Sequence, residues 1–316
     1  MLGMPKISYI KMDRSRKSNI FQKFNIFVPI LLVGMSIGLS CLNQDSNNID
    51  INQSDTSVEE NYFLAIGNTD IAVGTNRMIF SIIDKKNGPI ILDEVRVNYY
   101  YLDPKSTFKF HAPAKFVKWP ASNKGVYVSH TSFDKAGKWG VSVITPDGMY
   151  NVQAGIVVKD RSDSPSIGKL IPSSTSKTSK DVSALSQLTT SLIPNPKLYE
   201  LSIDEAISNG KSTVLTFATP AFCSTATCGP QVEIISSLST LYKGNVNFIH
   251  IEIYEHPHEI SGNPSNATMS PIVMEWGIKT EPFTFVIDND GVLRYKYEGF
   301  VTEKELIESI DKVTKY

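Results

Sequence analysis

Three kinds of hydrophobic patterning follow one another along the chain, and each predicts a different organisation. Residues 24–44 carry no charge, and positions 26–41 within them are almost continuously apolar (IFVPILLVGMSIGLSC). Residues 62–158 hold short runs rich in Val, Ile, Tyr and Phe, which turn-forming residues separate. Residues 201–313 alternate β-like runs with segments of helical periodicity. We therefore expect an N-terminal targeting segment followed by two folded regions of different class.

The N-terminal segment has the features of an export signal. Basic side chains precede the apolar run at Lys6, Lys11, Arg14, Arg16, Lys17 and Lys23. The run is about 15 residues long, which suits a signal peptide better than a span of roughly 20 residues. It ends in Gly38-Leu39-Ser40-Cys41, which resembles a bacterial lipobox with Cys41 as the lipidated residue. An uncleaved anchor and ordinary secretion are the alternatives. All three place the remaining chain on the extracytoplasmic side of the cell membrane, where disulfides persist.

Polar segments divide the remaining chain. Residues 42–60 are rich in Asn, Asp and Ser and predict a flexible tether that follows the signal peptide or membrane anchor of residues 1–41. Residues 161–196 are rich in Ser, Thr and Pro. Their few apolar side chains bury too little surface to offset the entropy of ordering, so we expect a linker. The predicted folded domains are therefore residues 61–160 and residues 197–316.

The region 61–160 is predicted to be all-β. Its β-like runs begin at Phe63, Met78, Val95, Val126, Trp139 and Ala154. The runs from Val95 and Val126 alternate apolar and polar positions, as half-buried strands do. Several short strands at near-regular spacing favour an antiparallel sandwich of immunoglobulin-like type, which would act as a spacer or an interaction module. His111 and His130 are isolated, so we expect no metal site there.

The region 197–316 predicts a β-α-β-α-β-β-α order after a short helix. The leading helix covers 201–210, with Ser202 able to cap it. The expected strands are 213–218, 246–253, 283–287 and 292–298, and the expected later helices are 230–242, 271–277 and 302–313. Strand 213–218 is almost wholly apolar, which indicates that both of its faces are buried.

Charge and composition change this picture little, whereas the cysteines change it considerably. The chain has 31 basic and 32 acidic side chains and a net charge of −1, which argues against a dedicated nucleic-acid binder. Of its three cysteines, Cys223 and Cys228 lie five positions apart in FCSTATCGP, directly after a predicted strand. This pair is the strongest candidate for chemistry in the sequence.

The surroundings of the pair resemble the thioredoxin family over roughly residues 197–316. The resemblance is carried by the strand VLTFATP, the cysteine loop before a helix, and the segment WGIKTEPFTFVIDNDG. It implies a central mixed sheet flanked by helices. It also places Glu281-Pro282 at the family's cis-proline loop, beside the cysteines. Phe222, Glu281 and Pro282 would then contact the substrate.

The sequence departs from the family pattern at four points. Four residues rather than two separate the cysteines, and Phe222 stands where a tryptophan is usual. Thr216 occupies the position of the family's buried acid, which helps proton transfer, and Glu281 precedes the proline where Thr, Val or Ile is common. Cys228-Gly229-Pro230-Gln231 resembles Cys-Gly-Pro-Cys, so either cysteine could be the nucleophile. We favour Cys223, because it follows an aromatic residue after the strand.

The resemblance implies thiol–disulfide exchange. A cysteine at a helix N-terminus has a lowered pKa, so Cys223 would attack a disulfide as a thiolate and Cys228 would resolve the mixed disulfide. An ionised Glu281 nearby would oppose that thiolate by like-charge repulsion. The expected partners are thiols and disulfides of exported proteins, a redox-partner protein, and the membrane through the N-terminal anchor. We expect no cofactor, no resident metal and no nucleic acid.

Two other interpretations of the cysteine pair stay open. An extracytoplasmic chain with two thiols beyond the lipidated one would favour a purely structural disulfide. Alternatively, Cys223, Cys228 and either His256 or His258 could hold copper in a metal-delivery protein. His250 alternates with apolar neighbours in a predicted strand and is expected to pack in the core.

Overall fold

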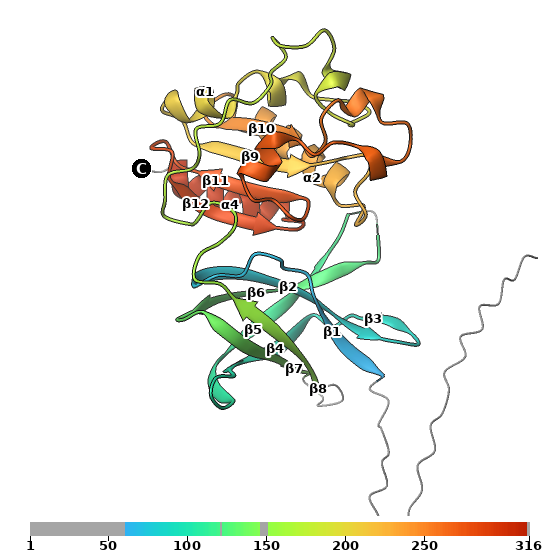
Figure 1. Cartoon of the computed structure of the whole chain (residues 1–316), viewed down its shortest axis with the longest axis vertical. Coiled ribbons are helices and arrows are strands. Elements are labelled where there is room, and N and C mark those ends of the chain that lie inside the picture. The colour runs from blue at the N-terminus through green and yellow to red at the C-terminus, as the bar shows by residue number, and fades with distance from the viewer. Residues whose placement is uncertain (1–60, 121, 146–150, 315–316) are drawn as a thin grey trace, which may run out of the picture. The chain divides into compact units, whose positions relative to one another are not determined.

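The computed structural model describes residues 61–120, 122–145 and 151–314. The first part of this range forms one eight-stranded antiparallel sheet (Figure 1). Its strands are β1 (Tyr62–Ile66), β2 (Gly74–Asp84), β3 (Gly88–Ile90), β4 (Glu94–Tyr101), β5 (Thr107–Lys118), β6 (Gly125–Phe133), β7 (Gly137–Ile144) and β8 (Asn151–Val158). The order is β1-β2-β6-β5-β4-β7-β8, and β3 pairs with β2. Aliphatic and aromatic side chains fill its core, where the rings of Phe133 and Trp139 meet edge to face.

The predicted two-sheet sandwich is not confirmed, because a single ladder of strand pairs runs from β1 to β8. The sheet is nearly closed: after β1, Val73 N donates a hydrogen bond to Lys159 O at 2.9 Å, just beyond the end of β8. Sequence analysis missed β3 and β5. Strand β5 contains Pro113, which argues against a central strand. At Pro113, however, β5 pairs only with β4, because its pairing with β6 begins at Lys115.

The second part of the described range is built on a four-stranded mixed sheet. Its strands are β9 (Thr213–Ala218), β10 (Asn247–Glu252), β11 (Phe283–Ile287) and β12 (Leu293–Glu298), in the order β10-β9-β11-β12. The α-helices are α1 (Ile203–Ser208), α2 (Cys228–Leu241), α3 (Pro271–Glu275) and α4 (Glu303–Thr314). Every element predicted for this region forms within two residues of its expected bounds. Strands β9 and β10 are parallel, and the other two pairs are antiparallel.

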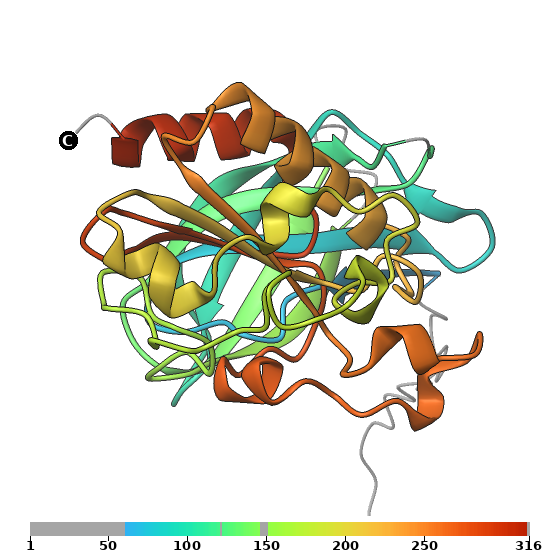
Figure 2. The ribbon, with the colours of Figure 1, turned by 90° about the horizontal axis from the view of Figure 1, so that it is seen from above.

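Alternate residues of β9 face opposite layers of the fold, and this explains why the strand is apolar throughout. Val214 packs in one cluster with side chains of α2 and α4, whereas Leu215 packs in the other with side chains of α1 and of the α3 segment. Figure 2 shows the two pairs of helices on opposite sides of the sheet. The carboxyl end of β9 is thereby held between two packed layers, directly before the cysteine loop.

The segment 161–196 is ordered and partly buried, contrary to the expectation from its composition. Its hydroxyl groups have hydrogen-bond partners in the neighbouring fold. Ser174 Oγ accepts from Trp276 Nε1 at 2.9 Å, and Ser176 Oγ accepts from Ile203 N at 3.1 Å. Ile171 and Leu188 also join the hydrophobic clusters of the neighbouring fold, so apolar burial and side-chain hydrogen bonds together hold the segment in place.

Charged groups join the eight-stranded sheet to the four-stranded one, and both belong to one compact unit. Arg77 of β2 donates to both carboxylate oxygens of Glu305 on α4, at 3.0 and 3.2 Å. Glu298, at the end of β12, accepts from Thr69 N at 2.7 Å and from the hydroxyl of Thr280 at 2.7 Å. Arg77 has a side chain only 3% exposed, so its ion pair is shielded from water.

The predictions for residues 1–41, including lipidation of Cys41, and for the tether 42–60 lie outside the described residues. In the described part of the chain, no helix has the length and apolar character that crossing a membrane requires.

We predict that Arg77→Ala lowers the free energy of unfolding by about 3–5 kcal/mol, because the largely buried Glu305 carboxylate loses its cation and the carbonyl oxygen of Phe300 loses a donor. Urea unfolding of the purified protein measures this change. Lys304→Ala is the matched control, because it removes an exposed pair with Glu308 on the same helix and should change stability little. Equal effects of the two substitutions would contradict the importance of the shielded pair.

Candidate functional site

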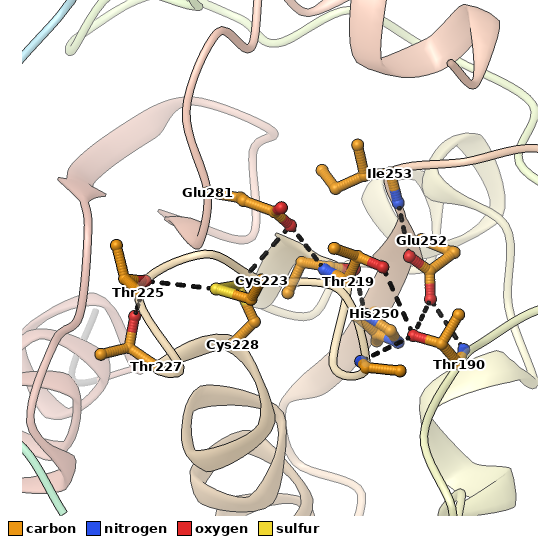
Figure 3. Close-up of a disulfide and its surroundings, with 12 residues drawn as sticks. Thr190, Thr219, Cys223, Thr225, Thr227, Cys228, His250, Glu252, Ile253 and Glu281 are labelled. Carbon is orange, nitrogen blue, oxygen red and sulfur yellow. Dashed lines mark hydrogen bonds between the residues drawn. A yellow bond between two sulfur atoms is a disulfide. The ribbon is translucent and has the colours of Figure 1, made fainter. Parts of the chain in front are cut away.

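Cys223 and Cys228 form a disulfide at the carboxyl end of β9, with their Cα atoms 5.9 Å apart (Figure 3). Strand β9 ends at Ala218, and α2 begins at Cys228 itself. In the intervening loop, Ala226 has a left-handed backbone with a φ of 57°. This conformation costs a non-glycine residue about 1–2 kcal/mol. The strained residue lies two positions before the first residue of α2.

The two sulfurs have different surroundings. Cys228 is fully buried, whereas Cys223 is half-buried, and its Sγ lies 3.2 Å from Thr225 Oγ1. The sequence argument expected the helix from residue 230 and gave the effect of its N-terminus to Cys223, whereas Cys228 is the first residue of α2. The unpaired N–H groups of the first turn therefore favour negative charge on Cys228. Cys223 is the sulfur that another molecule can approach.

Glu281 lies across the disulfide from the cysteine loop. The Glu281–Pro282 peptide bond is cis, as the resemblance implied, and Pro282 is buried. Thr219 N donates to Glu281 Oε2 at 2.7 Å, and this same oxygen lies 3.5 Å from Cys228 Sγ. Glu281 thus contacts the buried sulfur directly. Its predicted contact with a substrate stays a prediction.

A second carboxyl group lies behind Glu281. Burial raises the pKa of Glu281 to about 7, and the charge of Glu252 adds to this effect, while the hydrogen bond from Thr219 N opposes it. Burial also raises the pKa of Glu252, against hydrogen bonds from Thr219 and Thr190. Thr190 N and its hydroxyl donate to Glu252 at 2.8 and 2.9 Å. Thr219 therefore contacts both carboxyl groups.

Sequence analysis missed Glu252 but placed its neighbour on β10 correctly. His250 is buried, its ring bonds to Ala218 O and to the Tyr199 hydroxyl, and burial lowers its pKa to about 4. It is therefore a neutral core residue, as expected. Glu252 is the one acidic residue in the run VNFIHIEI, and a lone acid in a predicted buried strand could have identified it as a candidate site residue.

The remaining positions that the sequence analysis singled out make contacts within the fold. Phe222 is half-buried, and its ring packs edge to face against Tyr254 with centroids 6.5 Å apart. Thr216 has a buried hydroxyl that lies 3.0 Å from that of Thr284 on β11. The two hydroxyl groups therefore pair with each other across neighbouring strands. Gln231 Oε1 accepts from a backbone N–H after β12, so this side chain has a structural contact.

The structure does not bring a histidine to the cysteines. Within the described ranges, the cluster of metal-ligating groups that includes the pair consists of Cys223, Cys228 and Glu281, whose ligand atoms lie within 4.8 Å of one another. His256 and His258 are outside this cluster and lie against each other, with ring centroids 6.2 Å apart. The copper site that we considered from the sequence has no support in this arrangement.

Comparisons with known proteins give limited similarity. No protein-family model matches the chain, and no curated protein matches it. Among solved structures, it is similar to a thiol:disulfide interchange protein, a thioredoxin family protein from Chlorobium tepidum TLS, with 16% identity and a TM-score of 0.27 over 33% of this chain and 81% of that chain. It is also similar to the exposed lipoprotein thioredoxin Etrx1 from Streptococcus pneumoniae strain TIGR4, with 15% identity and a TM-score of 0.25 over 33% and 85%. Similarity at this level does not establish an activity, so the proposals below rest on the geometry of this chain.

We predict that Glu281→Gln weakens the loss of stability that the protein undergoes on passing from acidic to neutral pH. Between about pH 4.5 and pH 7 the folded protein holds a proton on Glu281 that the unfolded chain releases, so stability falls as pH rises through this window. Glutamine keeps an acceptor for Thr219 N but never ionises. Relative to wild type, the variant should gain on the order of 1 kcal/mol above about pH 8.

Urea midpoints of the oxidised protein across this pH range measure the effect. Glu275→Gln is the control, because Glu275 is exposed on α3. The explanation is wrong if the stability profiles of the Glu281→Gln variant and wild type run parallel. Part of the wild-type slope should persist in the variant, because the pKa of Glu252 is also raised.

Proposed function

We propose that the chain is a thiol–disulfide oxidoreductase that exchanges disulfides with exported proteins through Cys223 and Cys228. The observation that carries this proposal is the asymmetry of the disulfide. One sulfur is half-exposed on a loop, and the other is buried at the first residue of a helix beside a carboxyl group. This arrangement separates the attacked sulfur from the leaving sulfur.

Each chemical step uses this asymmetry. A substrate thiolate attacks Cys223 Sγ, the Cys223–Cys228 bond breaks, and the helix N-terminus stabilises the charge on the departing Cys228 sulfur. The second substrate thiolate then attacks the substrate sulfur of the mixed disulfide and releases Cys223. The substrate leaves as a disulfide, and the protein is left as a dithiol. The reverse sequence reduces a substrate disulfide.

A structural role for the disulfide is the weaker alternative. Cross-linking stabilises a protein mainly by restricting its unfolded chain, and the effect grows with the length of the closed loop. The residues joined here are only five positions apart, so the expected stabilisation is about 2 kcal/mol. A disulfide that closed a longer loop would stabilise the fold more.

We further propose that the described domains stand on the extracytoplasmic face of the cell membrane, attached through lipidated Cys41. The support is the basic flank, the apolar run and the lipobox-like ending of the first 41 residues. In this arrangement the eight-stranded sheet would set the distance of the cysteines from the membrane or contact a partner protein. A redox partner would restore the pair after each cycle.

We predict that Cys223→Ser abolishes exchange with a disulfide-containing protein substrate, because the accessible attacking sulfur is removed. Cys228→Ser should instead accumulate a mixed disulfide on Cys223, which non-reducing electrophoresis and mass spectrometry detect. Unchanged substrate reduction or isomerisation by Cys223→Ser would exclude the proposal. So would a reduction potential below about −300 mV for the pair, which is typical of structural disulfides.

We predict that Cys41→Ser abolishes incorporation of a fatty acid into the protein, because the thiol that would carry an acyl chain is removed. Metabolic labelling with a fatty acid and membrane fractionation measure the change, and Ser40→Ala is the neighbouring control. Wild-type protein that stays in the membrane fraction without incorporating the fatty acid would instead favour an uncleaved anchor.

A further inference from the structure

The buried sulfur of Cys228 requires a proton source within the protein. Its residue has no exposed surface, so bulk water does not reach the side chain. When the disulfide opens, the helix N-terminus stabilises the negative charge that develops on this sulfur, but without solvent a full thiolate is still costly, so the sulfur is more stable once it has taken up a proton. Whenever the disulfide closes, the same proton must leave. A titratable group in contact with the sulfur is therefore needed in both directions.

Glu281 is the group that contacts it. Its Oε2 lies 3.5 Å from Cys228 Sγ and is held in place by the N–H of Thr219 at 2.7 Å. In the strand beneath the loop, Thr216 offers only a hydroxyl, which is engaged with Thr284. The carboxyl group therefore reaches the sulfur from the loop before β11 rather than from β9.

We propose that Glu281 is the catalytic acid and base for Cys228 in disulfide exchange, an inference that rests on the proposed function. When a substrate thiolate attacks Cys223 and the disulfide breaks, protonated Glu281 gives its proton to the departing Cys228 sulfur and becomes a carboxylate. When a mixed disulfide on Cys223 is resolved, the Glu281 carboxylate takes the proton from the Cys228 thiol. The resulting thiolate attacks Cys223 Sγ and expels the substrate thiolate.

The groups around Glu281 suit it to both roles. Burial and the charge of Glu252 raise its pKa to about 7, so acid and base forms coexist near neutral pH, where general acid–base catalysis is most efficient. Besides the cysteines and Glu252, the titratable group that interacts with it is Tyr254, whose own pKa is raised by burial and by the two carboxylates. The like-charge repulsion expected from the sequence is thus relieved by protonation of Glu281.

The test follows the two sulfurs separately in the reduced protein. An excess of an aromatic disulfide reagent releases one coloured thiolate when Cys223 attacks and a second when Cys228 resolves the mixed disulfide. In Glu281→Gln we expect the second phase to slow by on the order of 10²-fold, with the first phase within about twofold of wild type. The wild-type second phase should rise with pH around 7, and the variant should lose this inflection. Glu281→Asp, which keeps a shorter acid, should restore part of the rate.

Two controls make the result decisive. Glu275→Gln changes an exposed glutamate and should leave both phases unchanged. In a Cys228→Ser background the second phase is absent, and adding Glu281→Gln should leave the first phase unchanged. The proposal is overturned if Glu281→Gln resolves at the wild-type rate with the wild-type pH profile, or if it slows the first phase equally in the Cys228→Ser background. Because the reagent needs no protein substrate, these outcomes are independent of whether protein disulfides are exchanged.

Discussion

The hydrogen bond from Thr219 N to the Glu281 carboxylate joins the parts of the site. It ties the end of β9 to the loop before β11, and so fixes one carboxylate oxygen against the sulfur at the start of α2. Without this bond, a partly buried acid would have no reason to point at the disulfide. The difference between the two cysteines, one accessible and one facing a carboxyl group, depends on this contact between segments about sixty residues apart.

The C-terminal part of the fold could be predicted from sequence because its signals are local. The local sequence is enough to predict the continuous apolar strand, the capped short helix and the amphipathic last helix. All three of them form. The N-terminal sheet could not be predicted to the same depth, because the choice between two sheets and one curled sheet depends on which strands pair. Strand β5 was missed because it contains Pro113, which disfavours a central strand. The local sequence does not show that β5 is paired on one side only at this residue.

Some features of the site could likewise be predicted from the sequence, and others could not. The cysteine pair and the cis Glu281–Pro282 bond were predicted from a resemblance that short motifs carry. The helix was expected from residue 230 and begins two residues earlier, at Cys228, because Pro230 in the first turn is compatible with several starting points. Burial of Glu281 and its interaction with Glu252 arise only when β10 and the two loops come together. An environment of this kind, rather than a motif, determines whether a glutamate repels a sulfur or exchanges a proton with it.

The Glu298 carboxylate receives hydrogen bonds from Thr69, ahead of β2, and from Thr280, directly before Glu281. One side chain thus connects the first sheet to the loop that holds the acid of the redox site. We therefore expect the position of Glu281 to depend on the eight-stranded sheet as well as on the strands around the disulfide. A chain shortened to residues 161–316 would lose Thr69, and with it the hydrogen bonds that the Glu298 carboxylate receives from the first sheet's side.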